Sequence, residues 1–193
     1  AINTDAVIRR VAANQWVRNV YIGRELPNKL VLEVRERNPL VLVKHAGDFY
    51  LMDEEGFVFK RLGKSDEVDL PILTGIDLQA EAKSPLFINV MNLLKHVAGS
   101  GKYSYLGTIS EIYLDDVFGL SLISDQGLYL KLGMEGFEKK LTRLTPVLAD
   151  LEQRGMKNGY LIIDLSDESK VTVQFRNAPG RIVQDNKGKQ YLI

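Results

Sequence analysis

The sequence lacks cysteine, net charge and long apolar runs, and each absence excludes a class of protein. Without cysteine there are no disulfides and no thiolate metal sites. Because 25 Lys and Arg residues balance 25 Asp and Glu residues, no overall field attracts nucleic acid or an anionic membrane surface. No apolar run reaches the roughly 18 to 20 residues that span a bilayer, and the N-terminus does not read as a signal peptide.

Catalytic residues are also scarce. The only histidines, His45 and His96, fall in different expected elements, which leaves little material for a metal site or a catalytic triad. The segment 99–102 (GSGK) falls short of a phosphate-binding loop, because His96 occupies the place of the first glycine. The acidic groups 53–55 and 115–116 lie where turns are expected. We therefore predict no catalysis, no cofactor and no metal.

What the chain does have is regular hydrophobic patterning. With 193 residues and 45% hydrophobic content, it is long enough for one ordinary domain and a small one. An amphipathic segment, 3–14, predicts a helix with Thr4 as its N-cap. Alternating apolar residues in 17–22 and 30–34, joined by turn residues 26–29, predict a hairpin with one apolar face.

The rest of the chain reads as more strands and two helices. Ser84 and Pro85 have the features of a helix start, and Pro146 is expected to kink or divide the last helix at about Leu144. A hairpin is predicted in 48–59, further strands in 70–75, 109–114, 119–124, 128–132, 160–165 and 170–175, and helices in 85–98 and 137–154.

One combination of residues in the hairpin is distinctive. It consists of Trp16, Val17, Val20, Arg24, Leu26, Pro27, Leu30, Val34, Glu36, Arg37 and Pro39. This combination resembles the polypeptide-transport-associated (POTRA) domain of the bacterial cell-division protein FtsQ, called DivIB in Gram-positive bacteria. Further similarity lies in 50–59, 130–133 and 162–165.

The resemblance implies a fold and an organisation. The expected fold is α+β: a truncated POTRA domain (helix plus β-hairpin) in 1–40, then a β domain of mostly antiparallel strands with packed helices in 41–176. Residues 177–193 are expected to form a tail that is mobile or adds a short strand. Because the family carries a cytoplasmic tail and a transmembrane helix ahead of this part, we expect a fragment that lacks the anchor and the first elements of the POTRA domain.

The resemblance also implies a function. FtsQ-like proteins recruit and hold other division proteins at the septum, notably FtsB and FtsL, or DivIC in Gram-positive bacteria, and have no known catalysis. The expected protein is thus a scaffold on the extracytoplasmic face of the inner membrane, attached only through its anchor. The alternative is a POTRA-type chaperone or docking module of a protein-translocation or outer-membrane assembly system.

The last predicted strand is the first candidate site. A final strand leaves backbone groups free for strand addition by a partner, and alternation puts Val171, Val173 and Phe175 on one face of it. The alternative is that these three residues simply face the core of an ordinary edge strand. The family's partner-contacting positions correspond by resemblance to Asp167, Ser169, Lys170 and Phe175, of which only Ser169 is identical.

A second candidate site lies in the N-terminal hairpin. The resemblance assigns the family's recruitment surface to Asn19, Ile22 and Arg24, and the acid of its E-x-x-P motif to Glu36. Glu36 could instead be a solvent-facing strand residue, or an ion-pair partner of one of its two neighbouring arginines. An exposed pair would contribute only about 0 to 1 kcal/mol.

Overall fold

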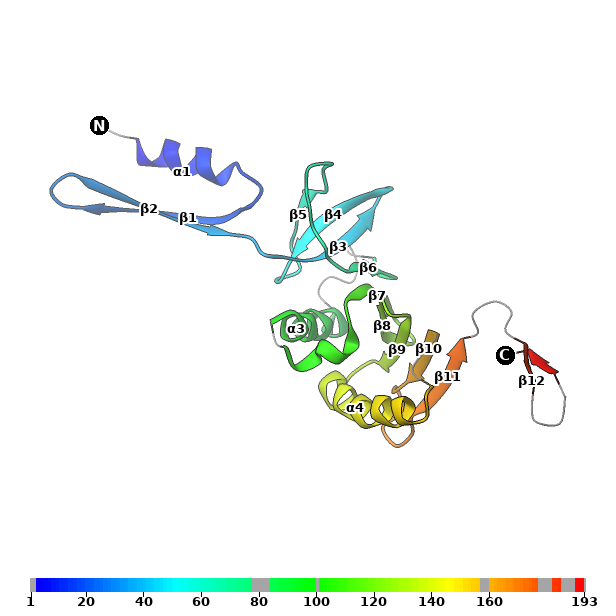
Figure 1. Ribbon diagram of the computed structural model, residues 1–193. Helices are drawn as coiled ribbons and strands as arrows, with labels where there is room; N and C mark the ends of the chain where they lie inside the picture. The colour runs from blue at the N-terminus through cyan, green and yellow to red at the C-terminus, as the bar shows by residue number, and fades with distance from the viewer. Residues whose placement is uncertain are drawn as a thin grey trace. The chain divides into compact units, whose positions relative to one another are not determined.

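The protein folds as two compact units, which are described separately. The computed structural model describes residues 3–77, 84–99, 101–156, 160–176, 182–184 and 190–192 (Figure 1). The first unit comprises residues 1–70 and the second residues 71–193. Both units combine helix and strand, so the predicted α+β class is confirmed.

The first unit begins with the predicted helix and hairpin (Figure 1). The N-cap of the helix is Asn3 and not Thr4, because the Asn3 side chain accepts a hydrogen bond of 3.0 Å from the Ala6 backbone N–H. The two strands pair antiparallel, with Ile22 opposite Leu32. The elements are α1 (Thr4–Ala12), β1 (Val17–Glu25) and β2 (Lys29–Glu36).

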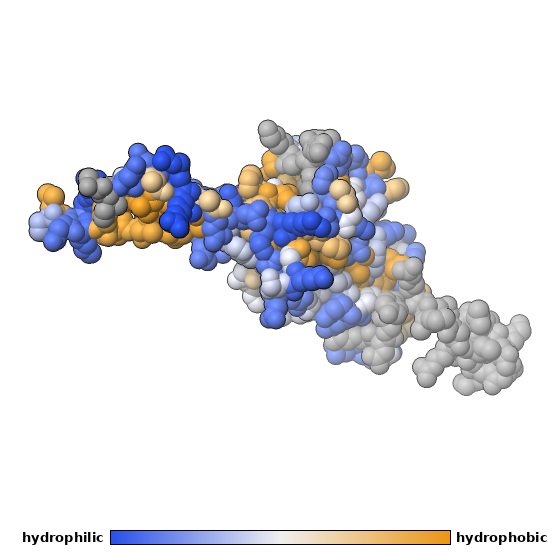
Figure 2. Space-filling view, turned by 90° about the horizontal axis from the view of Figure 1, so that it is seen from above, coloured by the Kyte–Doolittle hydropathy of each residue, from blue (hydrophilic) through white to orange (hydrophobic). Residues whose placement is uncertain are grey.

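The hairpin has one apolar face, as predicted, but α1 covers only part of it. Val20 and Ile22 on β1 are half-buried, on the strand that α1 contacts. On β2, by contrast, Leu30, Leu32 and Val34 keep 40%, 46% and 39% of their surface exposed. Figure 2 shows this apolar surface along the hairpin, next to the polar surface of α1.

An antiparallel meander completes the first unit. Its strands are β3 (Pro39–His45), β4 (Asp48–Asp53) and β5 (Val58–Arg61), paired in that order. Its core consists of the buried residues Val41, Leu42, Val43, Leu51, Met52 and Phe59.

Arg37 joins the hairpin to the meander. Its backbone N–H donates to the Trp16 carbonyl (2.7 Å), and its Nη1 donates to Asp53 Oδ2 (2.7 Å). The guanidinium also lies 4.3 Å from the centroid of the Phe57 ring. Asp53 is buried and closes its own turn by accepting from the Glu55 and Phe57 backbone N–H groups. The acidic run at 53–55 is therefore a turn, as predicted, whose first carboxylate anchors an arginine.

The second unit is built on a sheet of six strands in the order β11-β10-β9-β8-β7-β6. The β6–β7 and β9–β10 pairs are parallel and the other three are antiparallel. The predicted adjacency of β8 and β9 is confirmed. The strands are β6 (Ile72–Thr74), β7 (Ile109–Asp115), β8 (Gly119–Ser124), β9 (Leu128–Gly133), β10 (Tyr160–Asp164) and β11 (Thr172–Arg176).

Helices cover one face of this sheet (Figure 1). They are α3 (Pro85–Gly99), a 3-10 turn η1 (Gly101–Leu106) and α4 (Phe137–Gln153). As predicted, Ser84 caps α3, since its Oγ accepts from the Phe87 backbone N–H at 3.1 Å. The predicted division of the last helix near Leu144 is wrong, because α4 continues through Pro146. Pro146 is exposed, and buried leucines on both sides of it, Leu144 and Leu151, hold the helix in place.

Two short strands, β12 (Ile182–Gln184) and β13 (Gln190–Leu192), pair antiparallel with each other. The predicted extra strand at the end of the chain corresponds to β13. β12 also lies in the predicted tail, and residues 177–181, 185–189 and 193 lie outside the described residues. In the parts of the chain that the structure describes, no helix has the length and apolar character needed to span a membrane.

The turn into β8 yields the first testable prediction. Gly119 has φ +74°, and a Cβ there would lie 2.1 Å from the Gly133 carbonyl oxygen. Gly155 has a similar φ, +70°, with no atom within 4 Å of such a Cβ. We expect Gly155→Ala to lower the free energy of unfolding by about 1 kcal/mol and Gly119→Ala by more than about 3 kcal/mol. Urea unfolding measures both losses; equal losses would refute the close approach.

The Arg37 joint yields the second prediction. Removing Arg37 leaves the buried Asp53 carboxylate without its ion-pair partner. We therefore expect Arg37→Ala to lower the free energy of unfolding of the first unit by about 3 kcal/mol. Trp16 is the only tryptophan and packs edge-on against Phe59, so its fluorescence reports this unfolding. The control is Arg35→Ala, which removes an exposed pair with Glu33 and should cost about 0 to 1 kcal/mol. Equal costs would contradict the role of Arg37.

Candidate partner-binding edge

The strand β11 forms one edge of the sheet in the second unit. It pairs antiparallel with β10 on one side, with Val173 opposite Ile163 and Phe175 opposite Leu161. No strand among the described residues pairs with its other side. Every second residue of an edge strand leaves its backbone N–H and C=O unpaired within the sheet, and another extended chain can bind these groups.

The side chains of β11 are only partly covered. Val173 and Phe175 lie on the same sheet face as the buried Ile163 and Leu161. This agrees with the alternative that their side chains point toward the core. A core position does not explain their exposure, because Val173 is half-buried and 43% of the Phe175 surface is exposed. Phe175 thus offers an apolar contact beside the free backbone. The strand begins at Thr172, so Lys170 and the half-buried Val171 precede it.

The loop before β11 is held by a turn around Asp167. The Asp167 carboxylate accepts hydrogen bonds from the Ser169 hydroxyl (2.8 Å), the Ser169 backbone N–H (2.7 Å) and the Lys170 backbone N–H (3.2 Å). The Ser169 hydroxyl, then the Ser169 N–H, the Lys170 N–H and the nearby Arg143 charge lower the pKa of Asp167 below its ordinary value, against a smaller opposing effect of burial. Its carboxylate is therefore engaged within the loop, while the three residues themselves are exposed.

Helix α4 contacts the same loop through a residue that the sequence did not single out. Arg143 Nη1 donates a hydrogen bond of 2.9 Å to the Asp167 carbonyl oxygen. Nearby, Lys139 forms an exposed ion pair of 3.8 Å with Glu168. Nothing in the local pattern around Arg143 indicates this contact, because it depends on how α4, which connects β9 to β10 along the chain, packs in the folded unit.

The predicted residues in the first unit do not form one surface. Ile22 and Arg24 are opposite Leu32 and Leu30, on one face of the hairpin. Asn19 is an odd number of residues away from both and lies on the other face. The sequence grouped the three by resemblance, whereas strand alternation separates them.

Glu36 is exposed at the end of β2. The alternative that pairs it with a neighbouring arginine is not supported. Arg35 pairs with Glu33 at 3.2 Å, and Arg37 pairs with Asp53 at 2.7 Å. Glu36 is therefore a solvent-facing strand residue.

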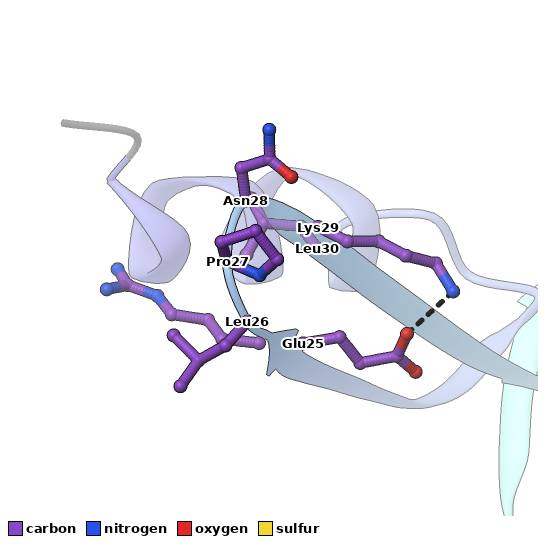
Figure 3. A pocket seen from close by; sticks show the side chains of 7 residues that line it. Glu25, Leu26, Pro27, Asn28, Lys29 and Leu30 are labelled. Carbon is purple, nitrogen blue, oxygen red and sulfur yellow. Dashed lines mark hydrogen bonds and ion pairs between the residues drawn. The ribbon is translucent and has the colours of Figure 1, made fainter.

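A shallow hollow of about 280 Å³ lies at the tip of the same hairpin, lined by 24–30 (Figure 3). Its one ion pair joins Lys29 Nζ to Glu25 Oε2 at 2.6 Å, and Leu26 is almost fully exposed beside it. Within the described ranges, no group of three or more His, Asp and Glu side chains could hold a metal ion. Because all the residues that line it are consecutive, the hollow is formed by the hairpin turn alone.

Comparison with known proteins assigns both parts of the chain. Residues 1–37 match the model of the FtsQ-type POTRA domain, so the N-terminal helix and hairpin belong to a POTRA domain of this type. Residues 41–166 match the model of the C-terminal part of cell division protein FtsQ/DivIB. The chain therefore belongs to the FtsQ/DivIB family of cell division proteins.

Curated relatives agree with this assignment. The chain is 36% identical over 168 residues to cell division protein FtsQ of Anaeromyxobacter sp. (strain K), covering 84% of this chain and 56% of that protein. It is 31% identical over 173 residues to FtsQ of Geobacter sp. (strain M21), covering 86% of this chain and 62% of that protein. The DivIB protein of Clostridium tetani is 24% identical over 180 residues, covering 90% of this chain and 68% of that protein. The chain thus spans a little over half of the length of the first two relatives.

The Asp167 turn yields the third prediction. Replacing Ser169 with Ala removes the hydroxyl that contributes most to the lowered pKa of Asp167, so this pKa should rise toward its ordinary value. The pKa of Asp167 is lower in the folded state than in the unfolded state. The turn therefore contributes its full stability at pH values above the pKa of the unfolded state, and this contribution is lost as the pH falls through the pKa of the folded state. Carbon-13 NMR titration of the Asp167 carboxyl measures the shift.

The control for this titration is Ser166→Ala. The Ser166 hydroxyl donates to Asp164 and not to Asp167, so this variant should leave the pKa of Asp167 unchanged. If Asp167 titrates alike in both variants, the Ser169 hydroxyl does not control the turn.

Proposed function

We propose that this protein is a non-catalytic scaffold of the bacterial divisome, which recruits and holds septal division proteins by strand addition at β11. Membership of the FtsQ/DivIB family supports the role in division. The open edge of β11 is the observation that carries the mechanism. Partners of the FtsB and FtsL type, or the DivIC type, are proposed from the resemblance.

The physics of an edge strand supports this mode of binding. Unpaired backbone groups supply most of the affinity in strand addition, and side-chain pockets supply the specificity. Here Phe175 is an aromatic group on the edge strand, opposite the buried Leu161 and on the same face of the sheet. Aromatic anchors of this kind commonly dominate binding energy at interfaces. Asp167, Ser169 and Lys170 would meet the partner where the added strand passes the start of β11.

The first unit supplies a second proposed contact region. Arg24 and Glu36 are exposed on the hairpin and are available to another division protein, whereas Ile22 is half-covered. We propose the POTRA part as 1–40 and the β domain as 41–176. The whole protein is proposed to reside on the extracytoplasmic face of the inner membrane at the septum, held by a transmembrane anchor as the resemblance implies.

The fourth prediction tests strand addition directly. The probe is a set of overlapping peptides from the membrane-proximal extracytoplasmic part of FtsB or DivIC of the same organism, titrated against this chain by calorimetry. Phe175→Ala should weaken binding at least about tenfold, as expected for an aromatic anchor. Ser169→Pro should weaken it as well, because it removes the N–H that donates to Asp167.

The matched control is Phe57→Ala, which truncates a phenylalanine of similar exposure in the first unit. It should leave peptide binding unchanged, and circular dichroism should show all variants folded. Absence of binding by the unmodified chain, or binding that is indifferent to both changes near β11, would reject the edge as the partner site.

A further inference from the structure

The first turn of α4 contains a buried lysine that binds the helix to the end of β9. Lys140 has only 5% of its surface exposed, and its Nζ donates a hydrogen bond of 2.8 Å to the Leu132 carbonyl oxygen. Leu132 is at a β-bulge, because Leu120 pairs with Gly133 and Ser121 pairs with Lys131. The ammonium group therefore satisfies a carbonyl that the bulge removes from the regular ladder.

One turn further along α4, Arg143 binds a second carbonyl. Its Nη1 donates to the Asp167 carbonyl oxygen at 2.9 Å, while the Asp167 carboxylate binds the N–H groups of Ser169 and Lys170. Asp167 is thus held on two sides, by the helix and by its own turn. Because β11 begins at Thr172, five residues later, the position of Asp167 determines the path of the chain into the edge strand.

The first contact positions the helix for the second. Lys140 seats the start of α4 on the end of β9, where a Cβ on Gly133 would lie 3.4 Å from Lys140 Nζ and 3.3 Å from Ser166 Cβ. The lysine, the end of β9 and the loop before β11 therefore meet at one place. With the helix seated there, the guanidinium of the half-buried Arg143 reaches the loop.

We propose that Arg143, seated by the buried Lys140, is a positioning residue for the partner-binding edge. It orders residues 166–170 before a partner arrives, so that binding does not have to include the entropy cost of ordering this loop. The inference rests on the proposed function, since it explains how the β11 edge is kept ready for strand addition. Arg143 acts through the backbone of Asp167 and needs no contact with the partner.

The fifth prediction compares three substitutions at two sites on α4. Arg143→Ala should speed amide exchange of Ser169 and Lys170 and weaken peptide binding by about three- to tenfold, the range expected for one lost hydrogen bond. The weakening should appear as faster dissociation. Arg143→Lys should recover part of both effects, because Lys can still donate one hydrogen bond. Arg154→Ala, which removes an exposed arginine paired with Asp150 on the same helix, should change neither quantity.

Hydrogen-exchange NMR and surface plasmon resonance with the peptides described above give the two readouts. Unchanged exchange at Ser169 and Lys170 in Arg143→Ala overturns the inference. Weaker binding without faster exchange also overturns it, since Arg143 would then contact the partner directly. If the unmodified chain binds no peptide, the proposed function fails with the positioning role, while exchange still shows whether Arg143 orders the loop. Lys140→Met is a second test of the inference. It removes the hydrogen bond to the Leu132 carbonyl that positions α4, so it should speed amide exchange of Ser169 and Lys170 as well, and unchanged exchange would contradict the role of Lys140.

Discussion

The ion pair between Arg37 and Asp53 is the interaction on which the organisation of the first unit depends. It joins the last residue of the POTRA match to the first hairpin of the region matched to the FtsQ/DivIB C-terminal model. Asp53 is almost fully buried, so its charge requires a partner, and Arg37 supplies it while also packing on Phe57. The Arg37 N–H fixes Trp16 in the same place. One arginine thus ends the hairpin and starts the meander.

Three aspartates show how acidic residues stabilise turns in this chain. Asp53, Asp115 and Asp167 each accept hydrogen bonds from backbone N–H groups two to four residues later. These bonds stabilise turns, and they lower the pKa of Asp115 and of Asp167. The polar side chains of the loops therefore shape the backbone, and the proposed binding chemistry belongs to the backbone of the edge strand.

The sequence predicted those elements whose pattern is local. Alternation located the hairpin and the three antiparallel strands from β7 to β9, and Ser84 with Pro85 located the start of α3. Local reasoning failed at Pro146, where packing of leucines on both sides outweighs the lost hydrogen bond. It also placed the first N-cap at Thr4, one residue after the observed cap Asn3, and both residue types suit the role. At the site, it selected Phe175 and the loop before β11 and missed Arg143.

By itself, the sequence determined the alternation of the strands and the presence of a strand that contains Phe175 near residues 170–175. These properties depend on neighbours within about ten residues, which set side-chain direction and turn formation. Only the tertiary structure decided that β10 pairs parallel with β9, that β11 is left at the edge, and that Arg143 reaches the Asp167 carbonyl. The reason is that strand order and helix placement come from burying shared apolar surface, Leu130 against Ile163 for example, between segments distant in the chain.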